Sequence, residues 1–142
     1  MGKDEPMIQR LSMVTRFVSD QDEAVAFYTE QLGFEVRMDH PGPHGRFVTV
    51  APPTDDDVEL ILMTPDGFDE DEAARLSALI GNEAGLIYAV DDCDAFCATL
   101  RERGVALDED PAEMPWGTQA VLSDPDGNEI VLQERVSATD NG

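Results

Sequence analysis

Basic residues are scarce in this sequence. Nine lysines and arginines stand against 31 aspartates and glutamates, giving a formal net charge of −22, and Lys3 is the single lysine. Without a basic stripe the chain cannot neutralise the phosphates of a nucleic acid, and the same charge opposes docking on anionic lipid. Nucleic-acid and membrane partners are therefore excluded.

Long apolar runs are also missing. No stretch approaches the roughly 18 residues of a membrane span, and the first ten residues, MGKDEPMIQR, lack the apolar segment of a signal peptide. The 142 residues are 42% hydrophobic, which is enough for one folded core. These features predict a single soluble domain over 1–142, located in the cytoplasm.

Cysteine is rare, and several catalytic motifs are absent. Cys93 and Cys97 lie four residues apart, on one face of an expected helix. A reducing compartment does not favour a disulfide, and two ligands do not make a zinc site, so buried apolar thiols are expected. The sequence contains no G-x-G-x-x-G, no P-loop and no G-x-S-x-G.

Acidic residues, by contrast, occur in runs such as 55–57, 69–72 and 108–110. At ordinary ionic strength this density would destabilise a compact state by self-repulsion. At molar salt the Debye length falls to about 3 Å and the repulsion is screened. We therefore predict a protein of a salt-adapted organism, whose charge reflects its solvent rather than a cationic partner.

The chain repeats itself at an offset of 72. Val18 corresponds to Val90 and Asp20 to Asp92, each pair closing a strand-like run before a helical pattern. The aspartates are suitable helix N-caps. Gly33 is expected to end the first helix, because a glycine readily adopts the positive φ that is common at helix C-termini. Two copies of one βαβββ unit follow from this spacing.

The expected modules span 11–65 and 84–136, with an added amphipathic helix within 66–83. The fold class is α+β, with the two βαβββ modules forming a curved mixed sheet that leaves a half-open cup. Because strand side chains alternate, every second residue of each strand points into the cup. Concave, mostly apolar surfaces of this kind bind small molecules.

The motifs of this pattern resemble those of the vicinal oxygen chelate superfamily, which includes glyoxalases, bleomycin-resistance proteins and extradiol dioxygenases. The resemblance rests on V-S-D-Q-D-E-A at 18–24, F-Y at 27–28, L-G-F-E-V at 32–36 and D-P-D-G-N-E at 124–129. It implies the paired-module fold over about residues 10–135, a small-molecule ligand and a homodimer.

The resemblance also implies four metal-ligand positions. Carried over by the motif spacing and the offset of 72, they are Met13, Glu59, Gly85 and Val131. A divalent cation needs several convergent donors, and among these positions only Glu59 offers a carboxylate. No cofactor is therefore expected, and a divalent metal stays the less favoured alternative.

Glu59 leaves three interpretations open. As a carboxylate in an apolar cup it could act as a general base. It could instead hydrogen-bond within the sheet or to Arg46 and do no chemistry. If the strand register differs by one residue, it points to solvent.

The ligand pocket is predicted from strand alternation and from the polar or aromatic residues of the strands and their loops. Arg46 is a candidate anchor for an anionic ligand and Trp116 a candidate lid. His40 and His44 lie in a Pro- and Gly-rich loop and are expected to be exposed. The predicted pocket residues are Met13, Thr15, Arg46, Phe47, Thr49, Glu59, Tyr88, Trp116, Val131 and Gln133.

The favoured function is a small-molecule-binding protein of the bleomycin-resistance type, without the full metal site. The alternative is a metal-assisted glyoxalase-type lyase or isomerase with Glu59 as the base. An extradiol dioxygenase is least favoured, because its iron site needs two histidines and a carboxylate. A purely structural or regulatory dimer is the remaining hypothesis.

Overall fold

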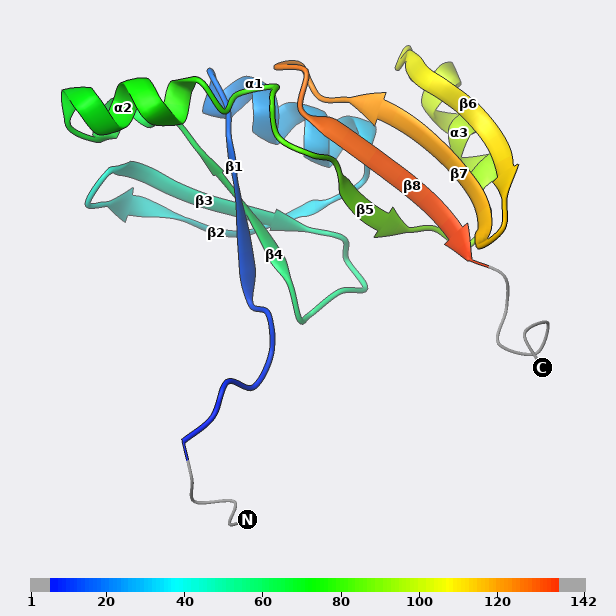
Figure 1. The fold of residues 1–142 in the computed structure, drawn as a ribbon, viewed down its shortest axis with the longest axis horizontal. Helices are drawn as coiled ribbons and strands as arrows, with labels where there is room; N and C mark the ends of the chain where they lie inside the picture. Colours follow the sequence, from blue (N-terminus) through cyan, green and yellow to red (C-terminus); the bar gives the residue numbers. More distant parts are fainter. Residues whose placement is uncertain (1–5, 136–142) are drawn as a thin grey trace.

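The chain folds as two βαβββ modules, each built on its own four-stranded sheet (Figure 1). The computed structural model describes residues 6–135. The first module comprises β1 (Met13–Phe17), α1 (Gln21–Ala26) with its π-helical continuation η1 (Phe27–Gln31), β2 (Glu35–Gly42), β3 (Gly45–Ala51) and β4 (Glu59–Met63). The second comprises β5 (Leu86–Ala89), α3 (Cys93–Glu102), β6 (Leu107–Met114), β7 (Gly117–Ser123) and β8 (Glu129–Arg135).

A 3-10 turn, η2 (Pro65–Gly67), and the helix α2 (Glu70–Ser77) connect the modules. The predicted α+β class with an extra helix between the modules is confirmed. The strands and α-helices fall within 11–65, 66–83 and 84–136, of which position 136 lies outside the described residues.

Matching end signals start and stop the module helices. The Asp20 side chain accepts a hydrogen bond from the Glu23 amide (3.0 Å) at the start of α1, and Asp92 accepts one from Ala95 (3.0 Å) at the start of α3. Such caps typically stabilise a helix by about 1 kcal/mol. After the first helical segment the chain reverses at Gly33, whose φ of 83° is strained for residues with a side chain.

Both sheets have the same strand order. They read β1-β4-β3-β2 and β5-β8-β7-β6, with the first strand parallel to the last of its module and the other neighbours antiparallel. In Figure 1 the first sheet lies on the left and the second on the right. Strands β1 and β5 are therefore edge strands of two separate sheets.

One face of each sheet is covered by helices and carries the core. Alternation places Val48, Leu62, Leu122 and Leu132 on this helix-covered face, where all are buried, together with Cys93 and Cys97 of α3. Each buried Leu or Val contributes about 1.5–3 kcal/mol relative to leaving it exposed. The two cysteines are free and buried, as predicted.

The modules are joined through buried polar contacts. Tyr28 of η1 donates to the Asp124 carboxylate (3.1 Å), and Asn128 donates to the Phe17 carbonyl (3.2 Å). The Asn128 side chain also accepts from the Gly81 amide (2.8 Å). The D-P-D-G-N motif thus fastens a turn of the second module to the first.

Arg16 provides a further joint. It lies on the helix-covered face of β1, only 4% exposed, and its guanidinium pairs with Glu83 (3.3 Å) and donates to the Ala84 carbonyl just before β5. A buried arginine of this kind needs such partners, because an unpaired buried charge is very costly.

A segment expected to be a loop and one of the acidic runs both belong to strands. His40 lies within β2, and the acidic run at 108–110 lies within β6. Both strands are irregular outer strands, with register shifts after Val36 and Leu107, so their side chains do not follow a regular alternation. His44, in the β2–β3 turn, is exposed and stacks on Phe68 with ring centroids 4.0 Å apart.

Within residues 6–135, every helix falls short of the length and hydropathy that a membrane crossing would require.

Candidate functional site

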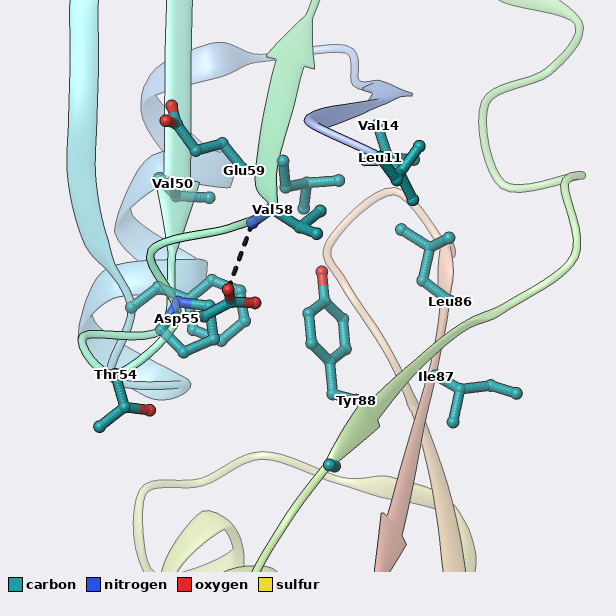
Figure 2. Close-up of a pocket in the computed structure, with 14 residues that line it drawn as sticks. Leu11, Val14, Val50, Thr54, Asp55, Val58, Glu59, Leu86, Ile87 and Tyr88 are labelled. Atoms are coloured by element: carbon teal, nitrogen blue, oxygen red, sulfur yellow. Dashed lines mark hydrogen bonds between the residues drawn. The ribbon is translucent and has the colours of Figure 1, made fainter. Parts of the chain in front are cut away.

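A mostly apolar hollow lies between the two modules, on the side of β1 and β5 (Figure 2). We call it the inter-module groove; its volume is about 440 Å³. The groove is lined by Leu11, Val14, Phe34, Val50, Pro52, Thr54, Asp55, Val58, Glu59, Leu60, Leu86, Ile87, Tyr88 and Ala89. A smaller apolar hollow of about 140 Å³ shares Phe34, Pro52, Tyr88 and Ala89 with it.

Side chains from both sheets form the groove. Val14 and Leu60 come from the helix-covered face of the first sheet, and Leu86 and Tyr88 from that of the second. Figure 2 shows the Tyr88 hydroxyl directed toward Val58 and Leu11 across the hollow. The two helix-covered faces therefore share one hydrophobic core, and the groove lies beside that core, between the two modules.

The loop 52–58 forms one wall, and Arg37 of β2 holds it. The Arg37 guanidinium donates to the carbonyls of Pro52 (2.8 Å) and Asp55 (3.0 Å). It also pairs with Glu35 (3.2 Å) and Asp56 (3.4 Å). These contacts give a loop without regular structure a fixed shape.

Tyr88 supplies a hydroxyl in apolar surroundings. Burial raises the pKa of Tyr88 to about 12; the nearby Arg16 opposes that rise in pKa and Asp55 adds to it. The phenol therefore stays protonated at neutral pH and can donate or accept a hydrogen bond.

Glu59 is engaged within its own sheet. Its carboxylate accepts a hydrogen bond from the Thr49 hydroxyl (2.6 Å), on the face opposite the helices. Figure 2 shows this carboxylate pointing away from Tyr88 and Asp55. Of the three interpretations, hydrogen bonding within the sheet is the one the contacts match, with Thr49 and not Arg46 as the partner.

The other predicted pocket residues are dispersed. On the face opposite the helices lie Met13, Thr15, Phe47 and Thr49 of the first sheet and Val131 and Gln133 of the second. Trp116, 46% exposed in the β6–β7 turn, donates to Gln119 (3.0 Å). Only Glu59 and Tyr88 of the ten line the inter-module groove, and Gln133 lines a separate, more polar hollow.

Arg46 lies away from the groove. It is on the helix-covered face, where it forms a two-pronged pair with Asp39 (2.9 Å for both bonds) and a third bond to Asp22 of α1 (2.7 Å). The predicted anchor for an anionic ligand is thus already neutralised by two carboxylates. These hydrogen bonds hold the pKa of the Asp39 carboxyl below its usual value.

The strand register corrects one of the four metal-ligand positions. Thr15 of β1 and Ile87 of β5 are equivalent positions and lie 72 residues apart. Thr15 pairs with Ile61 of β4 and Ile87 pairs with Val131 of β8, and these two partners are only 70 residues apart. The residue that corresponds to Val131, the position set by the motif spacing, is therefore Ile61 rather than Glu59, and Glu59 itself corresponds to Glu129.

These positions do not fit a metal site. Glu129 accepts from the Gly85 amide (3.1 Å), and its carboxylate fills the place where a side chain at position 85 would begin. Met13 adds only a thioether, a poor donor for a hard cation. Across residues 6–135, no three His, Cys, Asp or Glu side chains gather closely enough to hold a metal ion.

Sequence alternation could not find the groove, because its residues come from both faces of the strands. Val14, Leu60 and Leu86 have the pattern of ordinary core residues. The nearest sequence signal is the Pro52-Pro53 pair, which marks the loop but not its contact with the other module.

Known proteins place this architecture in a family. The family model described as glyoxalase/bleomycin resistance protein/dioxygenase superfamily matches residues 10–132. The chain belongs to this superfamily, as the vicinal oxygen chelate motifs predicted.

Several relatives cover almost the whole chain. TnmS3, an antibiotic binding protein from Streptomyces sp. CB03234, is 41% identical with a TM-score of 0.80, over 93% of this chain and 100% of its own. A superfamily member from Sphaerobacter thermophilus DSM 20745 is 36% identical with a TM-score of 0.75, over 92% and 100%. The uncharacterized protein YetH of Bacillus subtilis is 29% identical over 90% of this chain and 100% of its own.

Proposed function

We propose that this protein binds a small, largely apolar organic molecule in the inter-module groove, without a metal and without converting it. The observation that carries the proposal is the groove itself, a hollow of about 440 Å³ with mostly apolar walls and a few polar groups. Cavities of roughly 300–1,000 Å³ with this lining are typical small-molecule sites. The similarity to TnmS3, an antibiotic binding protein, supports a small-molecule ligand.

Catalysis by Glu59 has less support. The carboxylate is bound by Thr49 and directed away from the groove, and the aligned positions supply no convergent donors for a cation. A binding protein needs only shape and a few polar contacts, which the groove offers.

The homodimer implied by the family resemblance stays a prediction. Leu11 and Ile87, which line the groove, are 64% and 62% exposed. A second copy packed along the edge strands β1 and β5 would cover them and deepen the groove. Sedimentation equilibrium measures the mass directly.

A pair of variants tests the proposed function. Val58 lines the groove, lies outside the core and points into the hollow in Figure 2, so Val58→Phe should fill it. Amide NMR spectra would be titrated with indole, 2-naphthol and 4-tert-butylphenol. We expect shifts around the groove in the native protein and at least about tenfold weaker binding in Val58→Phe, a loss of about 1.4 kcal/mol.

The control is Val36→Phe, the same change at a half-exposed β2 site outside the groove lining. It should bind as the native protein does. The proposal fails if none of the probes shifts amides near the groove, or if both variants bind equally well.

A further inference from the structure

The charges of the inter-module groove all have one sign. Among the described residues that line it, the charged ones are Asp55 and Glu59, and none is basic; the Glu59 carboxylate is bound by Thr49 and points away from the hollow, which leaves Asp55. The remaining lining is apolar apart from Thr54 and the Tyr88 hydroxyl. This local composition, rather than the net charge of the whole chain, is complementary to a cation.

Asp55 is the carboxylate held at the groove. One of its oxygens accepts from the amides of Asp57 (2.8 Å) and Val58 (3.2 Å), which fixes the side chain in a tight turn. In Figure 2 the Asp55 carboxylate extends from the loop 52–58 toward the Tyr88 side chain, which comes from β5. Its negative charge also contributes to the raised pKa of Tyr88, as expected for neighbouring groups.

An aromatic corner lies beside this carboxylate. The rings of Phe34 and Tyr88 have centroids 5.3 Å apart and an interplanar angle of 65°. Both line the groove, with Pro52 next to them. The face of an aromatic ring attracts a cation, most strongly where water is excluded, and such corners bind quaternary ammonium groups.

Nearby arginines do not cancel this preference. Arg37 is paired with Glu35 and Asp56, and Arg16 with Glu83. Neither lines the groove. The charges of these two arginines are already balanced. A third, Arg10, donates to the Asp57 carbonyl through an exposed contact and does not line the groove, so a ligand meets the carboxylate and the rings.

We propose that the ligand of the groove is a lipophilic amine, an apolar or aromatic body carrying a protonated or quaternary nitrogen, with Asp55 as the counter-charge. Phe34 and Tyr88 would contact the ammonium group, and Val14, Leu60 and Leu86 the apolar body. This inference rests on the proposed function and narrows its ligand class.

Two probes of the same shape isolate the charge. 4-Hydroxyphenyltrimethylammonium and 4-tert-butylphenol differ only in a cationic nitrogen in place of a quaternary carbon. Their dissociation constants would be measured by NMR titration at pH 6.5 and one fixed KCl concentration. We expect the cation to bind about tenfold more tightly to the native protein.

Asp55→Asn keeps the oxygen that caps the turn and removes the charge. In this variant the preference for the cation should fall to about twofold, with binding of the neutral probe unchanged. Asp57→Asn is the matched control, since it removes the same charge from an exposed residue of the same loop that does not line the groove. It should retain nearly the full preference.

Three outcomes would overturn the inference. Equal or tighter binding of 4-tert-butylphenol would leave a binding groove without a charge preference, so the proposed function would survive alone. Equal losses in Asp55→Asn and Asp57→Asn would assign the preference to the general acidity of the surface. Absence of binding by both probes, together with no response to indole or 2-naphthol, would remove the proposed function as well.

Discussion

Several buried side chains are weak acids kept in their neutral form. Burial raises the pKa of Tyr88 to about 12 from 10.0, and that of the Cys93 thiol to about 12 from 9.0. The pKa of Tyr28 is raised as well, again chiefly by burial, with Asp124 adding to the effect. The fold therefore binds these protons more tightly than the unfolded chain does.

Stability should decline at alkaline pH for this reason. Between about pH 9 and 12 the unfolded chain loses these protons first, so the free energy of unfolding falls as pH rises, by about 1.4 kcal/mol per pH unit for each group within its window. The stabilising contribution is complete below pH 9. Urea unfolding at pH 8.0 and 10.5 measures it, and with a single lysine in the chain few other groups titrate there.

Cys93→Ala and Tyr88→Phe identify the groups responsible. Each variant should show a shallower loss of stability above its own unfolded-state pKa than the native chain. If both retain the native slope, the two side chains do not hold their protons in the way their burial implies.

At the scale of elements, local signals in the sequence determined what could be predicted. The helix starts at Asp20 and Asp92 follow from one residue type in one position, and the structure has both caps. The full length of the outer strand β6 could not be predicted, because an exposed strand needs no apolar residues and its run at 108–110 is acidic.

The candidate site was less predictable than the fold. The predicted pocket residues included Thr49 and Glu59, which share a hydrogen bond on one face, but also the neighbours Arg46 and Phe47, which lie on opposite faces of β3. Strand alternation could not reveal that a hollow opens on the other side, since that depends on how two modules meet. Contacts such as Phe34 with Tyr88, 54 positions apart in the chain, have no signature in the local pattern.

The turn at 124–128 joins the modules, and the side chain of its last residue, Asn128, makes two of the connecting bonds. Its side chain is 1% exposed and bonds to Gly81, Phe17 and Asp124. Asn128→Ala would leave these buried groups without partners, at about 1–3 kcal/mol each before relaxation. We expect a loss of about 3 kcal/mol in the free energy of unfolding, measured in urea.

Asn82→Ala is the comparison for this variant. Asn82 is exposed and bonds to two carbonyls, of Ala78 and Ile80, at the end of α2. Its loss should cost less than about 1 kcal/mol, because water replaces the side chain. Similar losses in both variants would show that Asn128 is not a joint between the modules.

At the scale of the whole molecule, the dominant property is the charge of −22. Among residues 6–135, ion pairs such as Arg16 with Glu83 involve only a few of the carboxylates, and most acidic side chains are exposed. We propose that the protein is adapted to high salt, because mutual repulsion of these carboxylates opposes the compact state until it is screened.

Potassium chloride should therefore stabilise the fold. Raising KCl from 0.1 to 1 M shortens the Debye length from about 10 Å to about 3 Å, and we expect the Tm to rise by about 5 °C or more. Calorimetry at several KCl concentrations measures this, with sucrose as an uncharged co-solvent for comparison. A Tm that ignores KCl would refute salt adaptation.

The change of offset from 72 to 70 has a consequence for how such a duplicated chain acquires specificity. It arises between β3 and β4, where the connection at 52–58 is two residues longer than its counterpart at 124–128. One copy of the ancestral connection is tied to its neighbour through Asn128 and has little freedom to vary. The connection at 52–58 makes no such bond through an equivalent of Asn128, so its residues can change and alter ligand preference without weakening the contact between the two modules.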